Sequence, residues 1–65
     1  MMDREAIEIF LGKKVKVEKG NGWFYRGIFK VTDDGIILED FKIGPIFIDF
    51  KDINSMEEWR EEYGK

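Results

Sequence analysis

The sequence predicts a mainly β protein, a small barrel of five strands with a short N-terminal helix. Apolar and polar residues alternate along several short runs, which is the pattern of strands that bury one face. Turn signals that contain glycine separate these runs. The longest run, residues 23–33, has apolar residues on both faces and Gly27 near its centre. A long strand that bends at a glycine can belong to both halves of a small closed sheet, so we expect a barrel rather than a flat meander.

The composition describes one small domain over residues 1–65. A domain of this size buries only about 60% of its unfolded surface, so its core is thin. Cysteine and histidine are both absent, which excludes disulfides and the commonest metal ligands, and we expect no cofactor. Charged residues make up 38% of the chain, which fits either an ordinary soluble surface or a thermophile-like, ion-pair-rich one. With no apolar run of roughly 20 residues and no signal-peptide pattern, we expect a cytoplasmic protein without a membrane partner.

The first predicted element is an amphipathic helix over residues 3–11. Asp3 occupies the N-cap position, where its carboxylate can accept hydrogen bonds from the free N–H groups of the first turn. The apolar face consists of Ala6, Ile7, Phe10 and Leu11. Gly12 then supplies a stop signal. A helix this short is unstable alone, so we expect it to pack on the barrel.

The barrel is expected over residues 13–57, and its first two strands form a hairpin. In residues 13–19, Val15 and Val17 face one way and charged residues face the other. Gly20-Asn21-Gly22 contains an Asn-Gly pair, a strong hairpin signal because both residues tolerate positive φ. We therefore expect the next strand to fold straight back on this one.

The central strand presents two different faces. One face carries Tyr25, Gly27, Phe29 and Val31, and the other carries Phe24, Arg26, Ile28 and Lys30. A glycine in the middle of a strand costs stability, so we expect Gly27 at a sharp bend or a close backbone approach.

Two further strands follow. Asp33-Asp34-Gly35 is a turn signal that leads into a third strand over residues 36–41. Pro45 cannot donate a hydrogen bond to a strand ladder and suits the start of a fourth strand, which continues over residues 46–50. The inward side chains of these two strands are Ile36, Leu38, Ile46, Ile48 and Phe50.

The tail after a tight turn at Lys51-Asp52 has two interpretations. We favour a fifth strand over residues 53–56 and a helical turn or two over residues 57–63. The alternative is an unbroken helix from Ser55, because Ser55 and Glu58 have the spacing of a capping box. Met56, Trp59 and Tyr63 would share one face of that helix.

The order of these elements resembles that of the Sm/Lsm-like superfamily of SH3-like small β-barrels, which includes the bacterial host-factor RNA chaperone. The resemblance covers roughly residues 4–57. It is carried by residues 12–17, Gly27-Ile28-Phe29, Asp33, residues 36–40 and residues 48–56. It implies a homo-oligomeric ring in which strand four of one subunit pairs with strand five of the next. It also implies RNA bases in pockets at the pore, stacked on a side chain and read by a loop asparagine, with an Arg-Gly or Lys-His element beside strand five.

The sequence departs from the family at the RNA-binding signatures. The loop after Asp33 is short, and Gly35 stands where the base-reading asparagine would be. Asp49 and Phe50 stand where the Arg-Gly pair would align. A glycine has no side chain with which to read a base, and an aspartate repels phosphate, so we expect the typical uridine pocket to be absent.

Basic residues on the outward side of the first two strands are the candidate nucleic-acid contacts, together with two lysines expected beside the pore. The predicted contacts are Lys14, Lys16, Arg26, Lys30, Lys42 and Lys51. Outward lysines also keep sheets soluble and block edge pairing, so this alternative stays open. Trp23, Phe24 and Tyr25 could stack single-stranded bases, or they could form a core plug or a subunit contact.

Outward apolar residues predict self-association, because one barrel interior cannot bury both faces of its strands. The predicted interface consists of Phe24, Ile28, Ile37 and Phe47. A ring is the form that the family suggests, and a dimer would satisfy the same physics.

Catalysis is not expected, because without cysteine or histidine it would need paired carboxylates, a perturbed lysine or a carboxylate metal site. The paired acids Asp33-Asp34 and Glu39-Asp40 suit a turn and a solvated strand edge. The sequence therefore predicts a non-catalytic, self-assembling binding module, and the resemblance to the Sm/Lsm-like superfamily implies RNA as its leading ligand. The alternative is a structural or protein-interaction module that has lost the base pocket.

Overall fold

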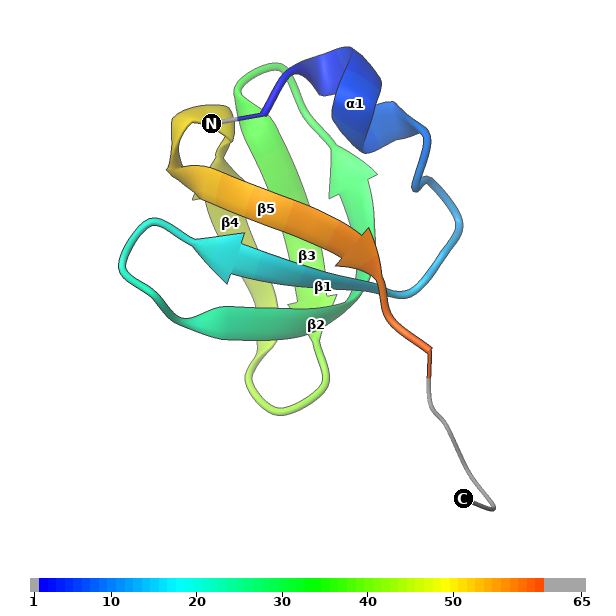
Figure 1. Cartoon of the computed structure of the whole chain (residues 1–65). Helices are drawn as coiled ribbons and strands as arrows, with labels where there is room; N and C mark the ends of the chain where they lie inside the picture. The colour runs from blue at the N-terminus through cyan, green and yellow to red at the C-terminus, as the bar shows by residue number, and fades with distance from the viewer. Residues whose placement is uncertain (1, 61–65) are drawn as a thin grey trace.

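The computed structural model describes residues 2–60. It contains a short helix, α1 (Arg4–Glu8), and five strands, β1 (Val15–Lys19), β2 (Phe24–Val31), β3 (Gly35–Asp40), β4 (Gly44–Asp49) and β5 (Ile53–Glu58), with a 3-10 turn η1 (Phe50–Asp52) between the last two. The strands form one antiparallel sheet in the order β4-β3-β2-β1-β5 (Figure 1). The predicted mainly β architecture with an N-terminal helix is confirmed, and β4 and β5 are the two edges of the sheet.

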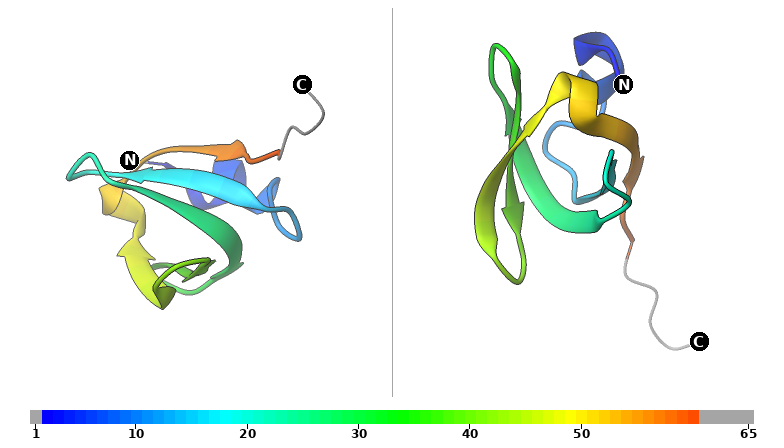
Figure 2. Two further views of the ribbon diagram at one scale, coloured as in Figure 1. Left: turned by 90° about the horizontal axis from the view of Figure 1, so that it is seen from below. Right: turned by 90° about the vertical axis from the view of Figure 1, so that its left-hand side faces the viewer.

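The sheet curves at Gly27, where β2 passes from one neighbour to the other. Its first half pairs with β1, up to Val15 opposite Gly27, and its second half pairs with β3, starting from Gly27 opposite Asp40. A Cβ atom on Gly27 would overlap the Glu39 carbonyl, so the two backbones approach too closely for any side chain. The close approach predicted for this glycine is confirmed, and Figure 2 shows the resulting curl of the sheet.

The hairpin between β1 and β2 forms at the predicted place. The Gly22 N–H donates to the Lys19 carbonyl at 2.9 Å, and Gly22 has a φ of +89°. Asn21 keeps a negative φ, and its side-chain oxygen accepts from the Trp23 N–H at 3.0 Å. Gly22 therefore provides the left-handed residue of this turn.

The core lies inside the curved sheet and follows the predicted alternation. Its buried apolar residues are Ile7, Val15, Val17, Phe29, Ile36, Leu38, Ile48, Ile53 and Met56. Every strand contributes at least one of them, and α1 contributes Ile7. The inward faces of β1, β2 and β3 are as predicted, because the side-chain period of a strand is set locally.

The helix is shorter than predicted, Arg4–Glu8 instead of residues 3–11. From Phe10 onward the chain tightens into turns, in which Phe10 N–H donates to Ile7 O and Leu11 N–H donates to Glu8 O. Leu11 is 48% exposed and does not belong to the buried face. Asp3 sits at the N-cap position, but its side chain makes no capping hydrogen bond. Gly12, with a φ of +82°, ends the segment as expected.

The helical turn predicted over residues 57–63 is wrong for the part that the structure describes, and residues 61–63 lie outside it. β5 continues to Glu58, which pairs with Val15 of β1, and the Trp59 N–H extends the contact to the Lys14 carbonyl at 2.8 Å. Ser55 donates to Glu18 on β1 at 3.4 Å instead of capping a helix. The ladder to β1 thus outweighs the local capping-box pattern. No helix within residues 2–60 has the length and apolar character needed to cross a membrane.

Candidate nucleic-acid interface

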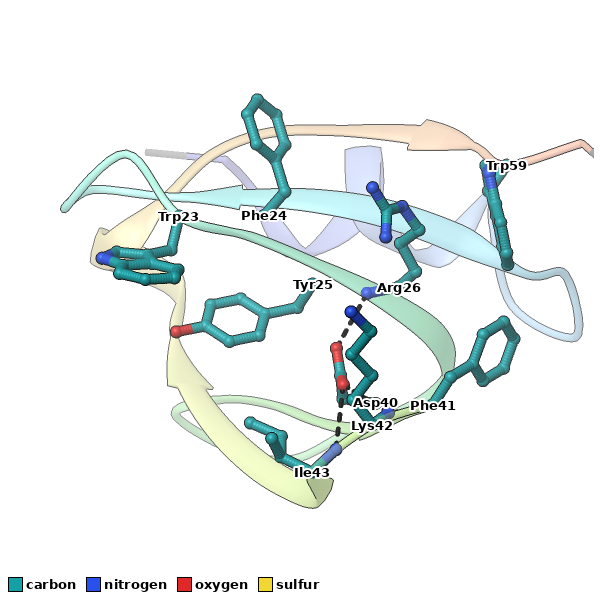
Figure 3. A pocket seen from close by; sticks show the side chains of 9 residues that line it. All are labelled: Trp23, Phe24, Tyr25, Arg26, Asp40, Phe41, Lys42, Ile43 and Trp59. Carbon is teal, nitrogen blue, oxygen red and sulfur yellow. Dashed lines mark hydrogen bonds between the residues drawn. The ribbon is translucent and has the colours of Figure 1, made fainter.

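An open groove of about 610 Å³ lies between the first half of β2 and the turn that joins β3 to β4. The residues that line it are Trp23, Phe24, Tyr25, Arg26, Asp40, Phe41, Lys42, Ile43 and Trp59. Figure 3 shows Trp23 and Tyr25 toward one end, Phe41 and Trp59 toward the other, and Arg26 and Lys42 between them. We call this feature the β2 groove.

Aromatic rings dominate the β2 groove and are largely open to solvent. Trp23 is 66% exposed and Phe41 is 56% exposed. Phe41 and Trp59 meet at a centroid distance of 5.1 Å with a 50° angle between the ring planes. Tilted contacts at this distance are favourable for aromatic pairs. Exposed rings held in place by a sheet provide flat faces on which a planar ligand can stack.

Three cations lie over these rings: Lys14 just before β1, Lys16 on β1 and Arg26 on β2. Lys16 Nζ lies 4.6 Å from the centroid of Phe24. Lys14 Nζ lies 5.9 Å from the centroid of Phe41 and 5.7 Å from that of Trp59. Arg26 Cζ lies 5.6 Å from the centroid of Trp59. Each contact contributes roughly 0.5–1 kcal/mol at an exposed site, and it also holds a positive charge beside a ring.

Asp40 connects the two sides of the β2 groove, β2 and the β3–β4 turn. Its Oδ1 accepts from the Lys42 N–H at 2.8 Å and the Ile43 N–H at 3.1 Å, and its Oδ2 accepts from the Arg26 N–H at 3.1 Å. Partial burial raises the pKa of the Asp40 carboxyl, but these three hydrogen bonds and the Arg26 charge outweigh it and lower the pKa below its usual value. Asp40 was predicted to be a solvated strand-edge acid and instead fixes the β3–β4 turn against β2.

Acidic residues accompany the cations on the neighbouring strands. Glu57 pairs in register with Lys16, and Glu18 pairs with Phe24. This cluster of positive charge is therefore confined to the rim of the β2 groove and does not extend over the neighbouring strands, in agreement with the net charge of −3 for the whole chain. Within residues 2–60, no cluster of three or more acidic, histidine or cysteine side chains has the arrangement of a metal site.

The structure brings four of the six predicted basic contacts to the β2 groove or its rim. Lys16 and Arg26 face each other across β1 and β2, Lys14 lies over the Phe41 and Trp59 rings, and Lys42 lines the groove. The other two lie elsewhere. Lys30 is opposite Ile37 on the second half of β2, and Lys51 is in η1. Lys42 and Lys51 were expected together beside a pore. Instead, Lys42 lies in the turn that joins β3 to β4, and Lys51 lies after β4, at the other end of this hairpin.

The predicted interface residues also separate into two groups. Ile37 pairs with Phe47 across β3 and β4, and Ile28 lies on the same outer face of β2. We call Ile28, Ile37 and Phe47 the outer apolar row; Phe47 is 52% exposed and Ile28 is 42% exposed. Phe24 lies apart from them, at the β2 groove, beside Lys16.

Sequence reasoning assigned no binding role to Phe41, Ile43 or Trp59. Ile43 is 61% exposed in a turn, and an apolar residue between two turn residues is a signal that could have marked it. Trp59 was assigned to a helix face. Its contact with Phe41 depends on the curvature of the sheet and has no local sequence signal.

Comparison with known proteins finds no significant match to this chain among protein-family models, curated proteins or solved structures.

Proposed function

We propose that this chain is a non-catalytic, Sm-like small barrel that self-assembles and binds single-stranded RNA through the β2 groove. The observation that supports the proposal most is the interleaving of cations and exposed rings. Lys14, Lys16 and Arg26 each lie within 6 Å of an aromatic centroid at the rim of one groove. Proteins that bind single strands combine these two elements, cations for the phosphates and rings for the bases. The reason for proposing RNA rather than another anion is the resemblance to the Sm/Lsm-like superfamily.

Self-assembly is supported by the edges of the sheet and by the outer apolar row. β4 and β5 are the terminal strands of the order β4-β3-β2-β1-β5, so within residues 2–60 each has one side without a strand partner. Exposed strand edges pair readily with other chains. A subunit contact that covered the outer apolar row would remove apolar surface from water and help a chain with so small a core. The family resemblance suggests β4-to-β5 pairing in a ring, and a dimer is the simpler form.

A protein-interaction module without RNA is the second candidate, and the geometry of Gly35 favours it. A Cβ atom at Gly35 would overlap the Ile48 carbonyl and lie 2.8 Å from the Asp49 Cα, so no base-reading side chain fits at this position. If the β2 groove does not replace the missing pocket, the outer apolar row is the remaining surface for a partner.

Titration of fluorescently labelled U-rich and A-rich oligoribonucleotides at two salt concentrations separates the two candidates. RNA binding predicts an affinity that falls steeply with salt, because phosphate contacts release counterions. Lys16→Glu should weaken binding about tenfold or more. Lys51→Glu is the matched control with the same charge change in η1, outside both the β2 groove and the outer apolar row. Absence of binding at tens of micromolar in low salt would refute the RNA proposal and leave the interaction module.

Light scattering at micromolar concentration tests the assembly. A species well above the 7.7 kDa of one chain is expected. Phe47→Lys, which places a charge in the outer apolar row, should lower the mass if that row is the interface. A mass of one chain for the unmodified protein would contradict self-assembly.

A further inference from the structure

We infer, on the basis of the proposed function, that the β2 groove binds a short single-stranded segment without distinguishing uracil from adenine. Bases would stack on the two aromatic ends of the groove, and the phosphate that joins them would lie between these ends. This places the ligand beside the β3–β4 turn. The resemblance would place a base pocket beside the turns at residues 32–35 and 50–52, at the other end of the β3–β4 hairpin.

The arrangement of the lining residues carries the inference. Trp23 and Tyr25 form one aromatic end, and Phe41 and Trp59 form the other, with Arg26, Lys42 and the Asp40 carboxylate in between (Figure 3). Three backbone N–H groups and Arg26 already offset the negative charge of Asp40, and the two cations outnumber this one carboxylate, so a phosphate is still attracted. A nucleic-acid strand presents the same order of groups, with a planar base on each side of a phosphodiester. The volume of about 610 Å³ falls within the range of small-molecule sites and suits a ligand of a few nucleotides.

The lack of distinction between uracil and adenine follows from the polar groups of the groove. Uracil and adenine are distinguished by side chains that pair with their edges, above all Asn and Gln. Arg and Lys, which the groove does contain, read guanine by donating to its O6 and N7 atoms, but they do not separate uracil from adenine. The nine lining residues include no Asn, Gln, Ser or Thr. Asp40 is the single lining carboxylate among them, and its two oxygens already accept three backbone N–H groups. Stacking on the rings and cationic contacts to phosphate remain, and both accept uracil and adenine alike.

Selection for single strands follows from the same geometry. In a duplex the base faces are stacked on each other and cannot reach protein rings, whereas an unpaired base can be splayed onto them. Duplex nucleic acid could still meet the cations, but it would not contact Phe41 or Trp59 as a stacking partner.

The chain offers a direct measurement, because both of its tryptophans line the β2 groove. Stacking of a base on Trp23 or Trp59 should quench the intrinsic fluorescence. The probes are a U-decamer, an A-decamer, an abasic decamer with the same phosphates, and a ten-base-pair duplex. The U- and A-decamers should bind within about threefold of each other and quench the emission, while the abasic decamer and the duplex should bind at least about tenfold more weakly with little quenching.

Ring-removing variants locate the site. Phe41→Leu and Trp59→Leu should each weaken decamer binding about tenfold. Phe50→Leu is the matched control, because it removes a ring in η1 that lies outside both the β2 groove and the outer apolar row. Circular dichroism checks that each variant is folded, and Phe41, 56% exposed, can lose its ring without opening the core.

The outcomes separate this inference from the proposed function. If the decamers bind and Lys16→Glu weakens them, but the abasic decamer binds equally well or the leucine variants bind like the unmodified chain, the stacking inference is overturned and RNA binding stands. A strong preference for one decamer over the other would also overturn it. If no decamer binds, the proposed function fails and the inference fails with it.

Discussion

At each end of the β3–β4 hairpin an aspartate carboxylate accepts a hydrogen bond from at least one nearby backbone N–H group, but the aromatic ring is half-buried at one end and exposed at the other. At the end with residues 32–35 and 50–52, the Asp49 carboxylate accepts from the Lys51 N–H at 2.9 Å. At the end with residues 40–43, Asp40 accepts from Lys42 and Ile43. At the first end the ring, Phe50, is half-buried, with the Arg4 guanidinium 5.7 Å from its centroid. At the second end the ring, Phe41, is exposed.

We call these the closed end and the open end. The closed end is tied together by contacts between distant segments. Arg4 of α1 donates to the Thr32 carbonyl, Phe50 N–H donates to Asp34 O at 3.1 Å, and Gly20 N–H donates to Asp52 O at 2.7 Å. At the open end the backbone N–H groups of residues 41–43 all have partners, but the side chains of Phe41, Lys42 and Ile43 are exposed. The closed end is therefore held by contacts between distant segments, whereas the open end exposes the side chains that the proposed ligand would contact.

The largest effect is expected from filling the close backbone approaches at the two ends. Gly35→Val at the closed end and Gly27→Val beside the open end would each place a Cβ into a backbone carbonyl. We expect each to cost about 3 kcal/mol or more, which is comparable to the whole stability of a domain this small. Gly20→Ala is the control, because its Cβ would meet its nearest neighbour, Asp52 Oδ1, at an ordinary 3.6 Å. Urea denaturation measures all three, and a folded, stable Gly35→Val would show that the strands at the closed end can separate.

The next largest effect is expected from truncating the buried side chain of α1, which tests whether the helix stabilises the closed end. Ile7 is fully buried and Ile9 is 68% exposed. Ile7→Ala should cost about 2–4 kcal/mol because it leaves a cavity under the helix. Ile9→Ala, the control, should stay within about 0.5 kcal/mol. Thermal unfolding followed by circular dichroism measures both, and equal effects would mean that the helix does not depend on its buried residue.

A smaller effect is expected in the turn of the closed end itself. The Thr32 hydroxyl accepts from the Gly35 N–H and donates to the Gly35 carbonyl, both at 3.0 Å. Thr32→Val keeps the shape and removes both hydrogen bonds, so it should cost about 1–2 kcal/mol. Thr32→Ser keeps the hydroxyl and should recover most of that loss. If chemical denaturation gives the same loss for both variants, the methyl group rather than the hydroxyl stabilises the turn.

These expectations depend on how far the sequence determines each end. The inward side chains of β1, β2 and β3 follow from alternation, and Gly27 follows from its position in a long strand, because both signals are local. Lys16 and Arg26 could be placed together because a hairpin makes their strands neighbours. The contact between Phe41 and Trp59 could not be predicted, because these residues meet only when the curved sheet brings the β3–β4 turn to the end of β5.

The error at the tail has the same physical origin. Ser55 and Glu58 form a capping-box pattern, which is local information, but β5 completes a ladder with β1 across a long stretch of chain. Non-local hydrogen bonds and the burial of Ile53 and Met56 decide the outcome. The open end was missed for the same reason, since its groove is assembled from β2, the β3–β4 turn and the residue that follows β5.

The smallest predicted effect concerns the acid that shapes the open end. The pKa of Asp40 is lowered in the folded chain, although burial alone would raise it, because three backbone N–H groups and Arg26 stabilise the charged form. A lowered folded pKa means that the ionised carboxylate adds stability above the unfolded value, near 3.9, and that this stability is lost as the pH falls through the folded value. Asp40→Asn should therefore cost up to about 1 kcal/mol at pH 7 and progressively less below about pH 4, where the unmodified chain also loses the charge.

Urea denaturation of both chains at pH 7, 5 and 3 measures that difference. Asp33→Asn is the control, because the Asp33 carboxylate is exposed and makes no side-chain hydrogen bond within the described part of the chain. A cost for Asp40→Asn that does not change with pH would mean that the shape of the side chain, and not its charge, holds the β3–β4 turn against β2. In that case the open end would be fixed by the same uncharged turn chemistry as Thr32 at the closed end, and the contrast between the two ends would rest on their exposed rings and cations alone.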